Sequence, residues 1–223
     1  MEGITLTSIL TFANLILSSA NAIVAFSLLM YIVMHNPRSA VARAFCALMA
    51  LVTWVYVADL GIAEVVTVHG AELWLRVQWL GIALMPGAYY HFSDALLRTT
   101  GSPSGWRRWL VMAGYAIGLG TFVLAAFGNA VVTGINQRDG IYHLLPGPAF
   151  WPFAAYYAAL TGWGWLNVRR ARSRSLTSTS RRRMSYLTLA IVAPVLSVFP
   201  YLLVPTAAHL LSPALVSVLT LLG

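Results

Sequence analysis

The chain has 223 residues, of which 59% are hydrophobic and only 9% are charged. Because a typical soluble domain carries roughly 25% charged residues, this composition excludes a water-soluble globular protein. The formal net charge of +8 arises from 14 basic residues, all of them arginine. They cluster in short groups beside apolar runs and not along one polar face, so nucleic acid is not an expected partner.

Seven apolar stretches are long enough to cross a lipid bilayer, which takes about 20 helical residues. In chain order they cover residues 4–33, 42–64, 72–97, 109–127, 149–168, 184–204 and 207–223. The first is expected to be a retained helix, because no basic segment of the kind that begins a secretory signal precedes it. The last has about 17 residues, the lower limit for a span, so we expect the chain to end within or at the end of a seventh helix. The pattern predicts an all-α membrane protein with one domain over residues 1–223.

The arginines indicate how the predicted helices are oriented. All of them except Arg76 and Arg138 fall in, or directly beside, the first, third and fifth connections. Short cytoplasmic loops of membrane proteins are enriched in basic residues, so these connections are expected to face the cytoplasm. The N-terminus would then lie outside and the C-terminus inside.

The connection between the fourth and fifth predicted helices, residues 128–148, is polar and rich in turn residues. Its Asp139-Gly140 pair stands between the short apolar runs Val131-Val132 and Ile141-Tyr142. An Asp-Gly turn between such runs is a strong hairpin signal. We therefore expect a short extracellular β-hairpin here.

Charged residues inside predicted spans are candidates for function, because lipid penalises them unless they are paired. Asp59 lies near the outer end of the second predicted helix, and Arg76 lies near the outer end of the third. The two could form an interhelical clamp, or they could belong to a polar site that binds a charged or hydrogen-bonding ligand. Glu72 precedes Arg76 by four residues, the favourable order for an ion pair on one helix face.

His91 and Asp94 are three residues apart and share a helix face near the inner end of the third predicted helix. A metal site needs further ligands, and none is suitably placed. His91 could act as a protonation switch near neutral pH or hydrogen-bond a neighbouring helix. Gly114-x-x-x-Gly118 is a separate signal, because small residues at this spacing allow membrane helices to approach closely.

Several motifs are absent from the sequence. Without lysine, the chain cannot form a retinal Schiff base, which excludes a rhodopsin-type pump or photosensor. The usual metalloprotease, phosphate-binding and serine-nucleophile motifs are also missing. We therefore expect no catalytic site, no metal, no cofactor and no enzymatic activity in this chain.

Motifs along most of the chain resemble the N-terminal seven-helix sensory region of bacterial sensor histidine kinases and related signalling proteins. These motifs are Arg43-Ala44-Phe45, Trp54-Val55-Tyr56, the run from Leu73 to Ile82, Pro86, His91-Phe92, the run from Pro146 to Trp151, Tyr156-Tyr157, Arg181-Arg182-Arg183 and Ala193-Pro194. The resemblance implies a multi-pass protein of the bacterial cytoplasmic membrane that acts as a sensory input. The kinase or cyclase machinery that follows such regions is not part of this chain.

The resemblance suggests that a signal acts on the outer half of the bundle and is relayed along the seventh helix to a cytoplasmic output domain of the same parent chain. The candidate ligand or signal residues are Asp59, Arg76, Gln78, Tyr56, Trp79, His91 and Asp94. The expected partners are the lipid bilayer, an unidentified small-molecule or membrane signal, the output domain and a second copy of the chain. The alternative is a small transporter or channel that uses Asp59, His91 and Asp94 as a proton or cation path.

Overall fold

The computed structural model describes residues 6–36, 38–138 and 141–175. The elements of this part are α1 (Leu6–His35), α2 (Ala40–Glu64), α3 (Val68–Arg98), α4 (Arg107–Phe127), β1 (Val132–Arg138), β2 (Ile141–Pro146) and α5 (Phe150–Arg174). The helices predicted over residues 184–204 and 207–223 lie outside the described residues, as does the basic run at residues 181–183.

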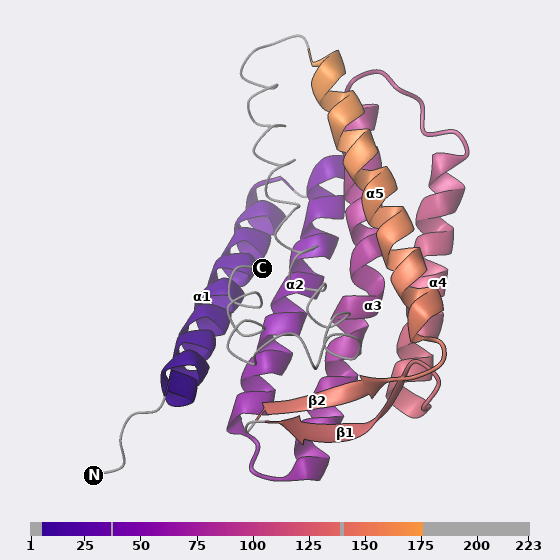
Figure 1. Ribbon diagram of the computed structural model, residues 1–223. Helices are drawn as coiled ribbons and strands as arrows, with labels where there is room; N and C mark the ends of the chain where they lie inside the picture. Colours follow the sequence, from indigo (N-terminus) through magenta and orange to yellow (C-terminus); the bar gives the residue numbers. More distant parts are fainter. Residues whose placement is uncertain (1–5, 37, 139–140, 176–223) are drawn as a thin grey trace.

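The helices stand side by side, and the two strands cross one end of the bundle (Figure 1). α3 is the central helix, because it packs against α2, α4, α5 and both strands, while α1 packs against α2. The connection between α1 and α2, the connection between α3 and α4, and the end of α5 all lie at the end of the bundle opposite the strands (Figure 1).

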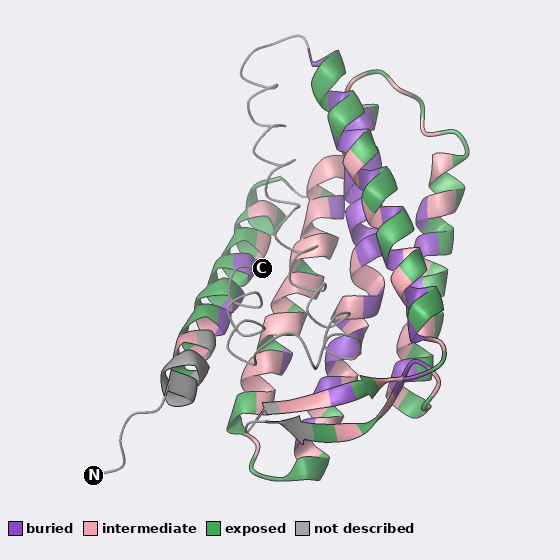
Figure 2. Cartoon of the chain, viewed as in Figure 1, coloured by how far each residue is buried: buried purple, intermediate pink, exposed green. Residues whose placement is uncertain are grey.

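Burial follows this arrangement (Figure 2). Most of α3 is buried, whereas α1 and α4 expose large apolar side chains such as Ile23 and Leu119. Within the described residues, 3 helical segments are long and apolar enough to span a membrane: Leu15–His35, Ala40–Glu64 and Arg107–Phe127. α3 can be less apolar than these, because its polar side chains face other helices, where they find hydrogen-bond partners.

The starts of α2 and α3 are set by capping side chains, which a hydropathy pattern does not detect. The Ser39 hydroxyl accepts a hydrogen bond from the Ala42 amide at 3.5 Å, and α2 begins at Ala40. The Thr67 hydroxyl accepts from the Gly70 amide at 3.2 Å, so α3 begins at Val68, ahead of the predicted residue 72. Such caps satisfy backbone amides in the first turn, which have no partner within the helix.

β1 and β2 pair in antiparallel fashion over the stretch for which the sequence predicted a hairpin, with a register irregularity between Thr133 and Ile135. The Asp-Gly turn that the sequence predicted at residues 139–140 lies outside the described residues. Beyond the strands, the Gly147 amide donates to the Val131 carbonyl at 2.8 Å. A Cβ atom at Gly147 would collide with the Ala130 carbonyl oxygen, so only glycine fits this close approach.

Glycines also set the distance between α3, α4 and α5. A Cβ at Gly118 of α4 would lie 2.6 Å from the Ala83 carbonyl oxygen, and one at Gly114 would lie 3.3 Å from the Gly87 Cα atom. A Cβ at Gly164 of α5 would collide with the Tyr89 ring. The predicted packing role of Gly114-x-x-x-Gly118 is therefore confirmed.

Candidate functional site

One turn of α3, residues 75–79, connects α3 to α2, α4, α5 and the strands. Successive helical residues point about 100° apart, so Arg76, Gln78 and Trp79 leave the helix in different directions. Arg76 reaches the end of α4, Gln78 reaches α2, and Trp79 packs against α5 and the strands. We call residues 75–79 the α3 hub.

Arg76 caps α4. Its Nη1 atom donates to the Ala125 carbonyl at 2.7 Å and to the Gly128 carbonyl at 2.8 Å, and its Nη2 atom donates to Asn129 Oδ1 at 2.9 Å. The Nε atom forms the predicted ion pair with Glu72 Oε1 at 2.9 Å. Because the last carbonyls of a helix lack partners within it, these contacts give Arg76 a structural role.

Asp59 belongs to a separate polar group, which joins α1, α2 and α3. The Gln78 side chain is 7% exposed, and its Nε2 atom donates to Asp59 Oδ1 at 2.5 Å and to the Val55 carbonyl at 3.4 Å. Tyr56 is close enough to interact with Asp59 and with the Asn21 side chain of α1. We call Asn21, Tyr56, Asp59 and Gln78 the Asp59 cluster.

The clamp between Asp59 and Arg76, one of the two alternatives from the sequence, is wrong. Arg76 is directed toward α4, while Asp59 faces Gln78 on α3. Among the residues that the structure describes, Asp59 forms no ion pair. A carboxylate in the strand-side half of an apolar bundle therefore has a neutral amide as its hydrogen-bond partner.

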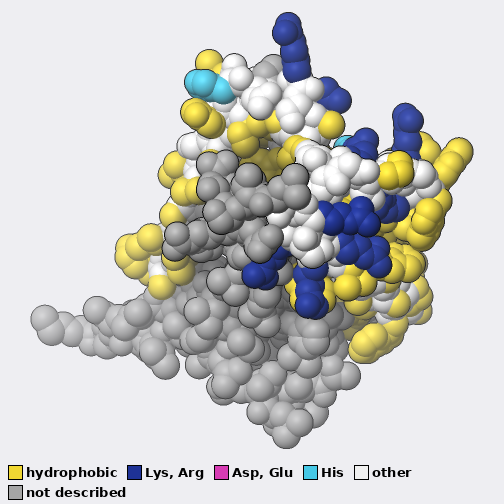
Figure 3. Space-filling model, turned by 90° about the horizontal axis from the view of Figure 1, so that it is seen from above, with side chains coloured by type: hydrophobic (Ala, Val, Ile, Leu, Met, Phe, Trp, Pro, Cys, Tyr) yellow, Lys and Arg dark blue, Asp and Glu magenta, His cyan; other side chains and the backbone are white. Residues whose placement is uncertain are grey.

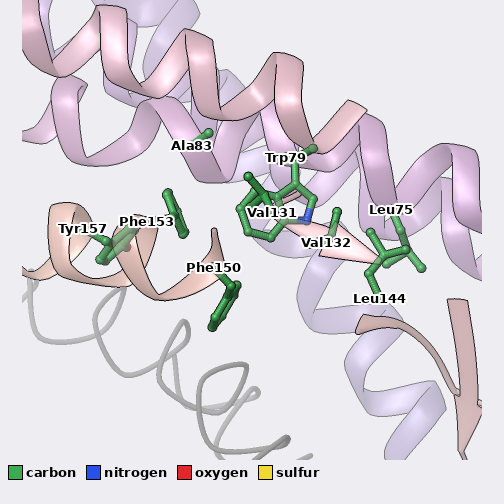
Figure 4. Close-up of a cluster of buried hydrophobic side chains, with 10 residues drawn as sticks. Leu75, Trp79, Ala83, Val131, Val132, Leu144, Phe150, Phe153 and Tyr157 are labelled. Atoms are coloured by element: carbon green, nitrogen blue, oxygen red, sulfur yellow. The ribbon is translucent and has the colours of Figure 1, made fainter. Parts of the chain in front are cut away.

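Trp79 lies in the main hydrophobic cluster and is 2% exposed. Its ring meets the Phe153 ring at a centroid distance of 5.1 Å and the Phe150 ring at 6.4 Å. Figure 4 shows it beside Val131 and Val132, which precede and begin β1. Trp79 thus anchors the strands and α5 to α3, and its predicted role in the signal site can only be indirect, through packing.

A second charged cluster lies at the opposite end of α3. The Asp94 carboxylate, 1% exposed, pairs with Arg107 Nε at 2.9 Å and with Arg98 Nε at 3.3 Å, and it accepts a hydrogen bond from Ser104 Oγ at 2.7 Å. Among the described residues, neither Arg107 Nε nor Asp94 Oδ1 has a hydrogen-bond partner, so their contact is an ion pair without a hydrogen bond. We call Asp94, Arg98, Ser104 and Arg107 the Asp94 cluster.

The Asp94 cluster fixes the connection between α3 and α4. Arg107 also donates to the carbonyls of Ser102 at 3.2 Å and Pro103 at 2.6 Å. The Arg107 side chain therefore holds the connection in two ways. It forms an ion pair with Asp94 of α3, and it donates hydrogen bonds to backbone carbonyls of the connection.

His91 makes the interhelical contact that the sequence suggested as one alternative. Its Nδ1 atom lies 3.3 Å from the Tyr115 hydroxyl of α4, and the two rings meet edge to face. His91 and Asp94 lie toward one end of α3 and the Asp59 cluster toward the other, so these residues do not form one site. Within the described part of the chain, no three metal-ligating side chains gather closely enough to hold a metal ion.

Sequence reasoning missed several members of both clusters. Asn21 gave no signal, because an isolated Asn on an apolar helix does not reveal which neighbour it faces. Asp94 and Arg98 stand four residues apart, and this acid-first spacing could have predicted their ion pair. Ser104 and Arg107 could be identified only once the connection between α3 and α4 was placed.

The arginines of three segments gather on one face, at the end of the bundle opposite the strands (Figure 3). The described ones are Arg38, Arg43, Arg98, Arg107, Arg108, Arg169, Arg170, Arg172 and Arg174. Arg169 packs over the Trp165 ring at 4.6 Å from its centroid. We call this end the arginine face, and it brings together the connections that the sequence assigned to one side of the membrane.

Comparison with known proteins gives a family but no curated relative. No curated protein matches the chain at a significant level. The family model for the N-terminal 7TM region of histidine kinase matches residues 17–222. The match covers most of the chain, including α1 from residue 17 onward, the other four described helices and the strands between α4 and α5. The chain therefore belongs to the family of N-terminal 7TM regions of histidine kinases.

Proposed function

We propose that this chain is the sensory input region of a bacterial histidine kinase, embedded in the cytoplasmic membrane by seven helices. In this proposal the arginine face is cytoplasmic and the strands between α4 and α5 are extracellular, with the N-terminus outside and the C-terminus inside. The gathering of arginines from three segments on one face supports this orientation, because basic residues are retained on the cytoplasmic side.

The Asp59 cluster is the proposed signal site. An ionisable group inside a membrane bundle is costly unless it is paired, so such groups mark functional sites. Asp94 is neutralised by two guanidinium groups, whereas Asp59 faces a neutral amide and a tyrosine. This contrast is the observation that carries the proposal. Asp59 would accept a cationic or hydrogen-bond-donating ligand.

The α3 hub offers a route from that site to the rest of the bundle. Gln78 contacts Asp59, while its neighbour Trp79 packs against α5 and the strands, and Arg76 caps α4. A ligand that displaces Gln78 would therefore shift one turn of α3 against α2, α4, α5 and the strands. The ligand must bind the two arrangements with different affinity for the shift to occur. The change would pass along the seventh helix to an output domain of the parent chain, and the input region itself would perform no catalysis.

Cysteine labelling tests the orientation. Cys46 is the only cysteine in the chain, so Cys46→Ser gives a background without thiols. Asn136→Cys on β1 and Ser173→Cys at the end of α5 would each add one thiol at an exposed position. In intact spheroplasts a membrane-impermeant maleimide should label Asn136→Cys, and it should label Ser173→Cys only after permeabilisation. The reverse pattern would overturn the orientation.

Kinase output tests the signal site. In the full-length parent protein in native membranes, Asp59→Asn and Gln78→Leu should change autophosphorylation several-fold. Glu64→Gln, which alters an exposed carboxylate at the same end of α2, serves as the matched control. Unchanged phosphorylation in both cluster variants, at normal protein levels, would exclude the Asp59 cluster as the signal site.

The transporter alternative receives no support from the described residues. Asp94 is held by two ion pairs and a hydrogen bond, and His91 faces Tyr115, so neither side chain is directed toward Asp59. Substrate-dependent flux in proteoliposomes that Asp59→Asn abolishes would nevertheless favour transport over sensing.

A further inference from the structure

A cleft of about 420 Å³ lies between the ends of α1 and α2 that border the arginine face. The last turn of α1 and the connection to α2 form its rim, and Phe92 of α3 contributes to its floor. This volume is within the range of small-molecule sites, about 300–1,000 Å³. The cleft is distinct from the Asp59 cluster, which lies toward the opposite end of the bundle.

The lining of the cleft is amphipathic. Ile32, Val41, Phe45 and Phe92 form the apolar part, and the Phe45 and Phe92 rings lie 5.4 Å apart between centroids. His35, Asn36 and Ser39 form the polar part, at the end of α1 and in the connection that follows. An occupant that matches both parts has an apolar chain and a polar head.

Positive charge flanks the polar part of the cleft. Arg38 and Arg43 lie on either side of Ser39 in the chain, and Arg43 Nη1 donates to the Arg38 carbonyl at 3.0 Å. Within the described residues, neither guanidinium forms an ion pair. The carboxylate of Asp94, which lies near this end of α3, is already engaged by Arg98 and Arg107. An anion at this rim would therefore meet two exposed guanidinium groups that no carboxylate among the described residues engages.

The imidazole of His35 is held in place at the rim. Its Nδ1 atom lies 2.9 Å from the Tyr31 carbonyl, and its ring stacks on the Tyr31 ring at 4.3 Å between centroids. Because a carbonyl only accepts, Nδ1 carries the proton in this contact. The Nε2 atom is then a hydrogen-bond acceptor, and it can take a hydroxyl donor of a head group.

We propose that this cleft binds an anionic phospholipid from the adjoining leaflet. One acyl chain would lie against Phe45 and Phe92, the phosphate would sit at the rim between Arg38 and Arg43, and a head-group hydroxyl would donate to His35 Nε2. Free phosphate would leave the aromatic floor empty, whereas a zwitterionic lipid would not neutralise the two arginines. The proposal rests on the chain lying in a membrane but not on its sensory role.

Photolabelling of the intact chain in lipid nanodiscs tests this site. The probe is phosphatidylglycerol with a diazirine in one acyl chain, and the comparison is phosphatidylcholine with the same modified chain. The charged probe should label peptides that contain residues 31–45 and Phe92 at least several-fold more strongly. Unlabelled phosphatidylglycerol should compete, and unlabelled phosphatidylcholine or millimolar inorganic phosphate should not. Equal labelling by both probes, or competition by phosphate alone, would overturn the proposal.

Two kinds of variant separate charge from shape. The double variant Arg38→Gln/Arg43→Gln should reduce labelling by the charged probe several-fold, whereas Arg172→Gln/Arg174→Gln on the same face should not. Ala42→Phe, which places a ring at the cleft, should reduce labelling while both arginines remain. The competition experiment with unlabelled lipids uses the wild-type protein. It therefore tests the site even if one of these variants fails to fold. Labelling unaffected by both the charge and the shape variants would also reject the site.

Discussion

Two carboxylates toward opposite ends of the bundle, Asp94 of α3 and Asp59 of α2, are in opposite circumstances. At the arginine face, Asp94 is enclosed by Arg98, Arg107 and a serine hydroxyl. In the strand-side half, Asp59 meets a glutamine amide and a tyrosine, and the nearby Arg76 is engaged by Glu72 and by the end of α4. The first arrangement neutralises a charge and fixes a connection between helices. The second leaves a carboxylate without a cation among the described residues, and this difference supports the proposed signal site.

The comparison also shows that a similar height on adjacent helices does not decide which charges pair. Asp59 and Arg76 are at similar heights on adjacent helices, yet Arg76 is directed to another neighbour because α4 ends beside it with unsatisfied carbonyls. A guanidinium has several donors in a fixed fork, and here they match a helix end better than a single carboxylate.

The largest expected effect is that of Asp94→Asn. It leaves the guanidinium of Arg107, whose side chain is 13% exposed, without its counter-charge. Removing one partner of a buried pair costs about 3–5 kcal/mol, so the free energy of unfolding in detergent should fall by that order. Arg98→Gln is the matched control, because its side chain is 39% exposed and exposed pairs contribute about 0–1 kcal/mol. Equal effects of the two substitutions would contradict the stabilising role of the buried ion pair between Asp94 and Arg107.

Helix packing gives the next largest effect. Gly118→Leu should lower the free energy of unfolding by about 1–3 kcal/mol, as overpacking does in cores, since its side chain would press on the Ala83 carbonyl of α3. Gly120→Leu on the same helix is the control, because nothing lies within 4 Å of a Cβ there. Thermal unfolding of both variants in the same detergent measures the difference, and similar melting temperatures would show that α3 and α4 are not packed at Gly118.

Arg76→Gln should have a moderate effect. It removes the donors that satisfy the Ala125 and Gly128 carbonyls, and an unsatisfied buried group costs about 1–3 kcal/mol. Hydrogen–deuterium exchange should show faster exchange at the end of α4 and in the strands that follow. Arg108→Gln, an exposed position at the start of α4, should leave exchange at that end unchanged. A wild-type exchange pattern in Arg76→Gln would argue against the cap.

The smallest expected effect on stability is that of Asp59→Asn. The new amide oxygen can still accept the hydrogen bond from Gln78, and an uncompensated charge disappears, so the free energy of unfolding should not fall by more than about 0.5 kcal/mol. Chemical or thermal unfolding alongside Asp94→Asn makes this a direct comparison of two carboxylates on adjacent helices. A loss as large as that of Asp94→Asn would show that Asp59 has a structural cation partner.

Hydropathy and arginine placement determined the helical membrane character, the approximate extents of the described helices and the common face of three arginine-bearing segments. These properties depend on transfer of side chains between water and lipid, which residue type largely decides. The differences lie at helix ends: α5 runs to Arg174, beyond the predicted residue 168, because a helix can continue past its apolar stretch. The family could also be recognised from local motifs, and the match over residues 17–222 confirms it.

Only the tertiary structure decided which polar groups meet. The Asp59 cluster takes residues from three helices, and the Arg76 cap joins positions 49 to 53 residues apart in the chain. Such contacts depend on the rotation and separation of packed helices, which glycines such as Gly118 and Gly164 help to set. A periodic pattern records which face of a helix is apolar, but not which neighbour each polar side chain on the other faces will reach.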